Sequence, residues 1–348
     1  MTAAPIVFES EEIAQHLVAG IPCAARAVLE LAERGQLAPN AVLLLAGRSV
    51  WQNPKAISDE IARLTPQVTV EFGSLDESEP EYVVDGVVAV SSNAVGGADA
   101  ELLAPAPLPK RSAKEARAAL DKAGKHIVAS TGKPTDGLVS EWINRPISQF
   151  ISYHWLKLAW VRPIHATIAA AICGIAMAIC LFSASPTGLV AGAILYQISS
   201  IIDGVDGEIA RAARRSSKWG ATLDTASDTV TNFGFITGVC FNIWRHGAQN
   251  AALVGLFGVL CLLVGLAVLG SRSMRAVGIL NFDAIKRDAK ATGSLGLAAA
   301  AKIASRDVYA LVFAIMIVVG LAGPAMILFG ACATIWLAGV LIMLARNP

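Results

Sequence analysis

The hydrophobic pattern of the chain changes near residue 160. Before that point, short apolar runs alternate with charged and polar residues, as in a soluble protein. After it, long uncharged runs follow one another, and runs of about 17 to 25 residues can cross the hydrocarbon core as helices. The pattern predicts six spans, 164–185, 187–202, 225–244, 250–270, 307–322 and 325–345. The second apolar run is short and must continue into the polar stretch that follows it.

Residues 1–125 predict a small α/β domain. The stretch EEIAQHLVAGIPCAARAVLELAERG has the apolar spacing of a helix that ends at a glycine. AVLLLAG, VTVEFG and DGVVAVSS are typical of short buried strands. Neither GxGxxG nor GxxxxGK[ST] follows a strand, so the common phosphate-binding loops are missing here.

Residues 135–160 predict an amphipathic helix that lies in the membrane interface on the cytoplasmic side. Its apolar residues, tryptophans included, recur at helical intervals with charged residues between them. The alternative is a soluble helix packed on the N-terminal domain. Residues 161–348 then form the six-span membrane domain, so the expected fold class is membrane all-α with a small α/β domain in front.

Charge adds orientation to this picture. The chain is 55% hydrophobic and 16% charged, and its net charge of +1 excludes a nucleic-acid binder driven by overall charge. Lys and Arg gather in the loops after the second and fourth spans, whereas the opposite loops share only Arg245. The positive-inside rule therefore places both ends and both basic loops in the cytoplasm, in a protein integral to the inner cell membrane. The N-terminus has no basic segment followed by an apolar core, which argues against a signal peptide.

The stretch DGVDGEIARAARRSSKWGATLDTASD begins at Asp203 and ends at Asp228, at the junction of two apolar runs. The sixteen residues on either side of it carry no charge. If the second span continues as a helix, Asp203, Asp206 and Ala210 share one face. Asp224 and Asp228 share a face of the next helix. Because helices joined by a short loop are neighbours, all four carboxylates can converge.

Four carboxylates in one place repel one another, and a divalent cation, or a pair of them, removes that problem. All-oxygen ligands without His or Cys select a hard ion such as Mg²⁺ or Mn²⁺. Gly207 and Ala210 leave room for a flat ligand, Gly220 allows close approach of the loop, and Arg211 offers a planar fork for phosphate. Together they indicate a site for a nucleoside diphosphate.

Three other interpretations remain open. A charged loop with helix caps would not need aspartates at these four spacings. A metal-ion transporter would carry polar residues on several spans near the midplane, whereas these cluster at one rim. An inactive membrane scaffold would be expected to have lost some of the site residues.

The stretch resembles the signature of the CDP-alcohol phosphotransferase (phosphatidyltransferase) family, D-x2-D-G-x2-A-R-x8-G-x3-D-x3-D, at all eight positions. The resemblance implies that a CDP-linked lipid or alcohol donates a substituted phosphoryl group to an acceptor hydroxyl and that CMP leaves. It implies two metal ions held by the four aspartates, with the last one, Asp228, also acting as the catalytic base. Gly207, Ala210, Arg211 and Gly220 would line the CDP site. It further implies a homodimer with lateral access for membrane lipid.

Two other segments bear on this resemblance. Family members carry a T-P-N-x-x-T-like stretch at the first span, and here Pro163 and Thr167 are kept while the Asn is lost. KPTDGLVSEWINRPIS, at 133–148, is similar to the segment before the membrane domain in the subgroup that makes di-myo-inositol phosphate phosphate. Proteins of that subgroup often carry an N-terminal nucleotidyltransferase domain. Since no LAAGxGxR-like loop is present, residues 1–125 are interpreted as a degenerate or unrelated α/β domain.

The acceptor is expected to be an alcohol or phosphorylated polyol of inositol type, on the strength of the subgroup resemblance. Arg272 and Arg275, at the end of the fourth span, are the candidate acceptor-binding residues because family members bind inositol phosphate in about this region. The alternative is that these arginines only follow the positive-inside rule.

Overall fold

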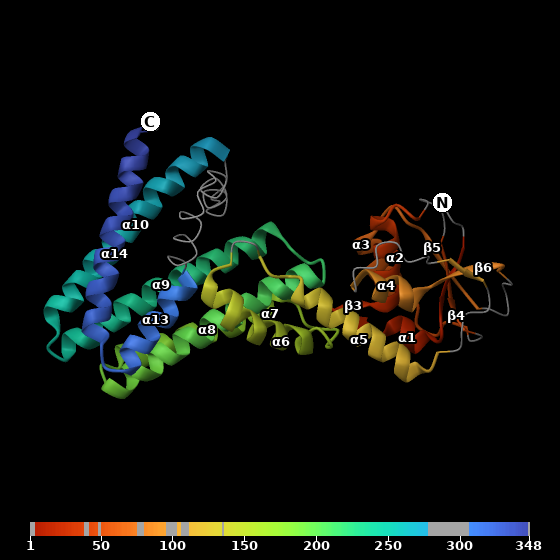
Figure 1. Cartoon of the computed structure of the whole chain (residues 1–348), viewed down its shortest axis with the longest axis horizontal. Helices are drawn as coiled ribbons and strands as arrows, with labels where there is room; N and C mark the ends of the chain where they lie inside the picture. Colours follow the sequence, from red (N-terminus) through yellow and green to blue (C-terminus); the bar gives the residue numbers. More distant parts are fainter. Residues whose placement is uncertain are drawn as a thin grey trace. The chain divides into compact units, whose positions relative to one another are not determined.

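The computed structural model describes residues 4–37, 42–47, 50–74, 80–94, 103–105, 111–133, 136–277 and 306–346 (Figure 1). Its contacts divide the chain into two compact units. The first unit contains Met1–Thr131, Gln149–Pro163 and Gly207–Ser216. The second unit contains Gly132–Ser148, Ile164–Asp206 and Ser217–Pro348.

The N-terminal part of the first unit is built on a five-stranded sheet in the order β5-β4-β1-β6-β7. The strands are β1 (Ile6–Phe8), β4 (Val42–Ala46), β5 (Val70–Gly73), β6 (Tyr82–Asp85) and β7 (Leu103–Pro105). The central strand β1 pairs in parallel with β4 and β6, whereas β7 pairs antiparallel with β6. The expected small α/β region is therefore present.

The helices of this part are α1 (Glu11–Gln15), α2 (Cys23–Glu33), α3 (Lys55–Leu64), α4 (Gly86–Ala94) and α5 (Ala113–Ala129). The single long helix predicted from Glu11 to Gly35 was wrong. A small antiparallel hairpin, β2 (Leu17–Val18) with β3 (Ile21–Pro22), separates α1 from α2. Gly20 at its turn has φ +81, a backbone conformation that side chains with a Cβ disfavour.

The strand predicted over DGVVAVSS was also wrong, because those residues form the helix α4 and the strand lies just before them. Asp85 makes the difference. Its carboxylate Oδ1 accepts hydrogen bonds from Val87 N and Val88 N at 2.9 and 3.0 Å, which starts the helix. Val87 and Val90 are then buried in the core beneath the sheet, and this burial overrides the strand propensity of valine.

The segment before the membrane helices is helical, as a short π-helical turn η1 (Ser140–Asn144) that continues into α6 (Arg145–Trp155). Its exposed large side chains include Trp142, at 75%, and Phe150, at 66%. The polar Ser148 and Ser152 are 1% and 0% exposed. Large apolar side chains of this segment are therefore exposed, although Tyr153 of α6 is buried.

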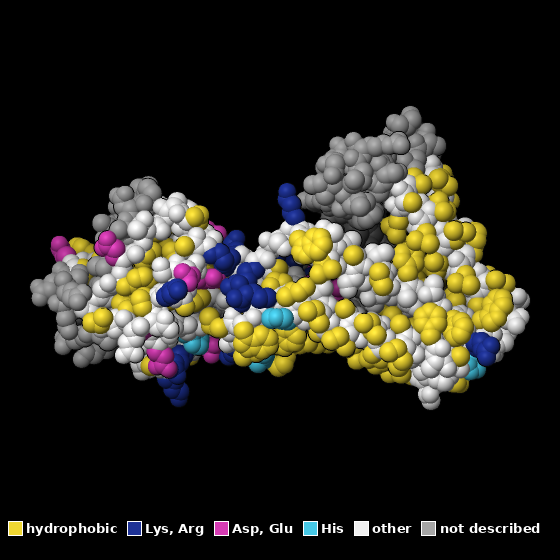
Figure 2. Space-filling view, turned by 180° about the vertical axis from the view of Figure 1, so that it is seen from behind, with side chains coloured by type: hydrophobic (Ala, Val, Ile, Leu, Met, Phe, Trp, Pro, Cys, Tyr) yellow, Lys and Arg dark blue, Asp and Glu magenta, His cyan; other side chains and the backbone are white. Residues whose placement is uncertain are grey.

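The described chain from residue 163 onward is made of the helices α7 (Pro163–Phe182), α8 (Pro186–Ala212), α9 (Lys218–Arg245), α10 (Gln249–Val277), α13 (Arg306–Val318) and α14 (Ala322–Arg346), with α8 continuing into the first unit. Figure 2 shows hydrophobic side chains over much of the visible surface of these helices. In α7 the exposed isoleucines recur every three or four residues, at 164, 168, 172, 175 and 179. The buried side of α7 carries Ala166, Ala170 and Gly174, small residues that let membrane helices approach closely.

In the described part of the chain, four helices are long and apolar enough to cross a membrane: Pro163–Phe182, Pro186–Ala212, Gln249–Val268 and Ala322–Ile342. Among the described residues, the predicted third and fifth spans do not meet this standard. Asp224 and Asp228, together with several threonines, make the first half of α9 polar. The described part of α13 has 13 residues, about 20 Å of helix against a hydrocarbon core of roughly 30 Å.

Candidate active site

The polar stretch forms the end of one helix and the start of the next. α8 runs through Asp203 and Asp206 to Ala212, and α9 begins at Lys218, after the N-cap Ser217. The side chain of Ser217 accepts a hydrogen bond from Gly220 N at 3.0 Å, which fixes the first turn of α9. The two helices therefore present their aspartates on either side of a short connection.

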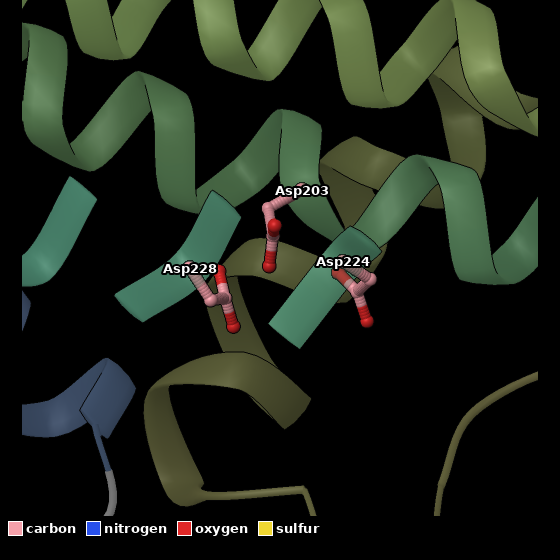
Figure 3. Close-up of side chains that lie close together, drawn as sticks. All are labelled: Asp203, Asp224 and Asp228. Carbon is pink, nitrogen blue, oxygen red and sulfur yellow. The ribbon is translucent and has the colours of Figure 1, made fainter. Parts of the chain in front are cut away.

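Three of the four aspartates come together. Carboxylate oxygens of Asp203, Asp224 and Asp228, one from each residue, lie within 4.8 Å of one another. In Figure 3 Asp203 points from α8 toward the space between Asp224 and Asp228 on α9. All three residues are half-buried. The spacing argument expected all four carboxylates to converge, and the structure groups three of them.

The fourth aspartate, Asp206, is held by a residue of another helix. Its Oδ2 accepts a 2.6 Å hydrogen bond from Thr167 Oγ1 of α7, and Asp206 is 6% exposed. The sequence carried a signal for this contact, since Thr167 is the threonine kept in the T-P-N-x-x-T-like stretch. A buried carboxylate that receives a hydroxyl donor has one orientation fixed.

The arginine of the stretch folds back along its own helix. Arg211 Nε donates to Thr131 O at 2.8 Å, and a Cβ built on Gly207 would lie 2.9 Å from Arg211 Nη1. The guanidinium therefore lies over Gly207, in space that a larger side chain would fill. Ala210 stands between them on the helix, and its carbonyl accepts a hydrogen bond from Arg215 N at 2.7 Å.

Gly220 has a different environment, because it is exposed and a Cβ there would lie 3.0 Å from Ser217 Oγ. Its lack of a side chain serves the cap of α9 in this structure. Arg272 and Arg275 fall in the last turns of α10, and their side chains lie outside the described residues.

Sequence reasoning missed a pair of residues that lies beside α8. Arg145 Nε and Nη2 donate to the two oxygens of Asp136, at 2.8 and 3.0 Å. A Cβ on Gly204, the neighbour of Asp203, would lie 3.5 Å from Arg145 Nη1. Burial raises the pKa of Asp136, but hydrogen bonds and charge from Arg145 outweigh burial and hold that pKa below its usual value. Both residues belong to the 133–148 segment that carried the subgroup resemblance.

The three clustered carboxylates fit a divalent cation by their chemistry. They offer oxygen ligands only, and at this spacing one ion can reach an atom from each side chain. Such an ion would neutralise charge on phosphate oxygens and orient them. The chain itself supplies Asp203, Asp224 and Asp228 as ligands.

Comparisons with known proteins agree with this chemistry. Residues 160–345, just over half of the chain, match the model of the CDP-alcohol phosphatidyltransferase family, whose members generally use divalent metal ions. A bifunctional IPC transferase and DIPP synthase of Aquifex aeolicus is 34% identical over 125 residues, 36% of this chain and 28% of that protein. Its namesake in Thermococcus kodakarensis is 38% identical over 118 residues, 34% of this chain and 26% of that protein.

A third protein of the same name, in Archaeoglobus fulgidus, is 38% identical over 116 residues, 33% of this chain and 22% of that protein. Each match spans less than a third of the relative's own length. With four apolar helices long enough to span a bilayer, the chain is an integral membrane protein. It belongs to the CDP-alcohol phosphatidyltransferase family.

Proposed function

We propose that the protein transfers a substituted phosphoryl group from a CDP-alcohol to an acceptor hydroxyl and releases CMP. The cluster of Asp203, Asp224 and Asp228 carries this proposal, because it places three oxygen ligands together within the family signature. Attack by an alcohol on the diphosphate builds negative charge on the attacking and leaving oxygens, and divalent cations held by these carboxylates would stabilise that charge. The reaction would serve phospholipid or inositol-phospholipid synthesis.

In the proposed site, four aspartates hold two divalent ions, either Mg²⁺ or Mn²⁺. Asp203, Asp206 and Asp224 serve as ligands, and Thr167 orients Asp206. Asp228 serves as a ligand and takes the proton of the acceptor hydroxyl. Carboxylate ligands favour these hard cations over softer ones.

The nucleotide of the donor is proposed to bind along α8. Arg211 contacts the diphosphate through its planar guanidinium, and Gly207 and Ala210 allow the nucleotide to approach the helix. Gly220 is assigned to the same site through its place in the signature. The donor itself is a CDP-linked lipid or polyol.

The acceptor is proposed to be an alcohol or phosphorylated polyol of inositol type. The names of the curated relatives, IPC transferase and DIPP synthase, support this class, as does the resemblance of residues 133–148. Arg272 and Arg275 at the end of α10 are the proposed contacts for its phosphate. We further propose that the protein forms a homodimer.

The proposed topology has six spans, with the α9 and α13 segments crossing beside the four apolar helices. Residues 1–125, the site and both ends of the chain then face the cytoplasm. Residues 135–160 lie in the interface, which the exposed Trp142 and Phe150 support because they would meet lipid. Residues 161–348 form the membrane domain.

The decisive experiment incubates the purified full chain with radiolabelled CDP-alcohols and a panel of acceptors, with CMP release as the readout. Transfer should require Mg²⁺ or Mn²⁺, stop with chelator and fall in Asp224→Asn. If no combination of donor and acceptor releases CMP with metal present, the alternative of an inactive membrane scaffold is favoured. Metal uptake into vesicles without CMP release would favour the transporter.

A further inference from the structure

The end of α8 adopts a strained conformation that its sequence does not favour. Arg215 N donates to Ala210 O at 2.7 Å, and Arg214 N donates to Arg211 O at 3.3 Å. This is the Schellman arrangement, in which glycine usually fills the left-handed position. Here that position is Arg214, with φ +52. An arginine that adopts a conformation suited to glycine indicates that its surroundings hold it there.

Two arginines of the N-terminal α/β domain cap the carbonyls at this helix end. Arg26 of α2, 2% exposed, donates from Nη2 to Ala212 O at 2.7 Å. Arg63 of α3 donates to Ala213 O at 3.0 Å and to Arg214 O at 2.7 Å. The last carbonyls of a helix carry partial negative charge, so cations bind there favourably.

The contacts also run in the opposite direction. Arg214 pairs with Glu33 at 2.9 Å, and Arg215 pairs with Glu60 at 3.3 Å. Glu60 also receives Arg63 at 2.7 Å. Burial raises the pKa of Glu60, but the two arginines outweigh burial and lower that pKa. Arginines of the domain therefore bind carbonyls of the helix end, and arginines of the helix end bind carboxylates of the domain.

The same short segment is held from other elements of the first unit as well. Ser152 Oγ of α6 donates to Glu208 Oε2 at 2.6 Å, and Glu208 is fully buried. Arg211 Nε is held by Thr131 O, just beyond α5. Arg211 thus lies in the segment 208–215, in which contacts hold Glu208 before it and the carbonyls of Ala212 to Arg214 after it.

We propose that the N-terminal α/β domain positions Arg211 for the donor nucleotide, with Arg26 and Arg63 as positioning residues that act through the carbonyls of Ala212 to Arg214. This inference rests on the proposed function for the identity of the ligand. It assigns the domain a role in the transfer reaction, which its sequence, without phosphate-binding loops, does not suggest. Arg26 and Arg63 act on the nucleotide only through the helix end.

The test uses the full chain in detergent or nanodiscs and compares Arg63→Ala with Arg63→Lys and Arg117→Ala. Arg63 is the better target because Arg26 is buried and its removal endangers folding. In Arg63→Ala, Glu60 still has Arg215 as a partner. Arg117 forms an ion pair with Glu12 in the same domain, so Arg117→Ala removes a comparable pair away from residues 208–215.

Three measurements separate the outcomes. Hydrogen exchange over 208–216 should become faster in Arg63→Ala, and CDP should bind more weakly with Mg²⁺ present, by roughly threefold to thirtyfold. The affinity of Mn²⁺ alone should stay unchanged. Arg63→Lys keeps the charge but loses the guanidinium, which donates to two carbonyls at once. Its exchange rate over 208–216 and its CDP affinity should therefore lie between those of wild type and Arg63→Ala. Arg117→Ala should behave as wild type.

The inference is overturned if exchange over 208–216 stays the same in Arg63→Ala, or if CDP binding does. It is also overturned if Mn²⁺ affinity falls in parallel with CDP affinity, since that result indicates a general loss of structure. A wild-type protein that binds no CDP would instead contradict the proposed function. Hydrogen exchange would then still decide whether Arg63 fixes the helix end.

Discussion

Thr167 Oγ1 of α7 donates a 2.6 Å hydrogen bond to Asp206 Oδ2 of α8. This contact connects the helix that begins the membrane domain to a carboxylate of the family signature. Asp206 is 6% exposed, so solvent offers little replacement for the hydroxyl. The threonine therefore fixes the direction in which Asp206 presents its second oxygen.

Removing this hydroxyl should disturb the site while leaving the helix intact. Thr167→Val keeps the shape and β-branching of threonine but cannot donate. We expect metal affinity or turnover to fall roughly tenfold to a hundredfold, the range for a lost partner of a ligating group. Thr167→Ser keeps the donor and serves as the control. Equal Mn²⁺ affinity and equal CMP release in all three proteins would remove Thr167 from the site.

Two glycines one turn apart on α8 give a second prediction. A Cβ at 207 would lie 2.9 Å from Arg211 Nη1 and must displace the guanidinium, whereas one at 204 would make an ordinary 3.5 Å contact with Arg145 Nη1. Both Gly→Ala changes should stabilise the helix, by about 1 kcal/mol each. Only Gly207→Ala should weaken CDP binding, by tenfold or more if a charged hydrogen bond of about 1.5–3 kcal/mol is lost. Equal CDP affinities in the two variants would contradict this role for Gly207.

The sequence predicted the grouping of aspartates better than it predicted the elements of the soluble domain. Carboxylates three, four and twenty-one residues apart could be assigned to helix faces, because helical geometry is regular. Asp203, Asp224 and Asp228 do come together, whereas Asp206, expected in the same cluster, accepts a hydrogen bond from Thr167. The contact between Asp136 and Arg145 was not predictable in the same way, since Asp136 lies in irregular chain before the helical segment that carries Arg145, and no periodicity reports its position.

The errors in the soluble half have one physical cause. In α4, valines prefer strands by local propensity, yet the helix cap formed by Asp85 and burial on the sheet decide the outcome. In the segment from Glu11 to Gly35, the apolar spacing continues through a hairpin whose turn depends on Gly20. Tertiary packing thus outweighs local pattern where elements are short.

Acid should weaken the pair formed by Asp136 and Arg145. The folded-state pKa of Asp136 lies below its unfolded value of about 3.9, so ionised Asp136 stabilises the fold above that value. This contribution is lost as the pH falls through the folded pKa. The difference in Tm between wild type and Asp136→Asn should therefore be constant near neutral pH and shrink below pH of about 4. Asp59→Asn, at an exposed position of α3, is the control; a difference for Asp136→Asn that does not change with pH would argue against the pair.

The distribution of basic residues gives a prediction on orientation. Single cysteines at 214 and 290 should be labelled by an impermeant reagent only from the cytoplasmic side, and one at 247 only from outside. The arginines and lysines near 214 and 290 favour the cytoplasm. The single cysteines are introduced into a protein whose six native cysteines are replaced by serine or alanine. That cysteine-free protein is the control and should not be labelled from either side. Labelling of 214 from outside would contradict both the topology and the placement of the site.

Asp228 lies one helical turn beyond Asp224 on α9, and its carboxylate joins the cluster with Asp203. Asp228→Asn keeps the size of the side chain and one ligating oxygen but cannot take a proton. If Asp228 is the base, turnover should fall by roughly a hundredfold or more, the usual scale for a lost general base. CDP binding and Mn²⁺ binding should be largely retained.

Asp224→Asn provides the matched comparison, because it changes the same chemical group on the same helix. Asp224 is proposed as a ligand without a proton-transfer role. The Asp224→Asn protein should therefore bind both Mn²⁺ and CDP more weakly and turn over more slowly. The two variants therefore separate binding from proton transfer: a loss confined to turnover in Asp228→Asn assigns the base. Loss of Mn²⁺ and CDP binding to the same degree in both would make Asp228 chiefly a ligand, and the acceptor proton would then have to leave through another group.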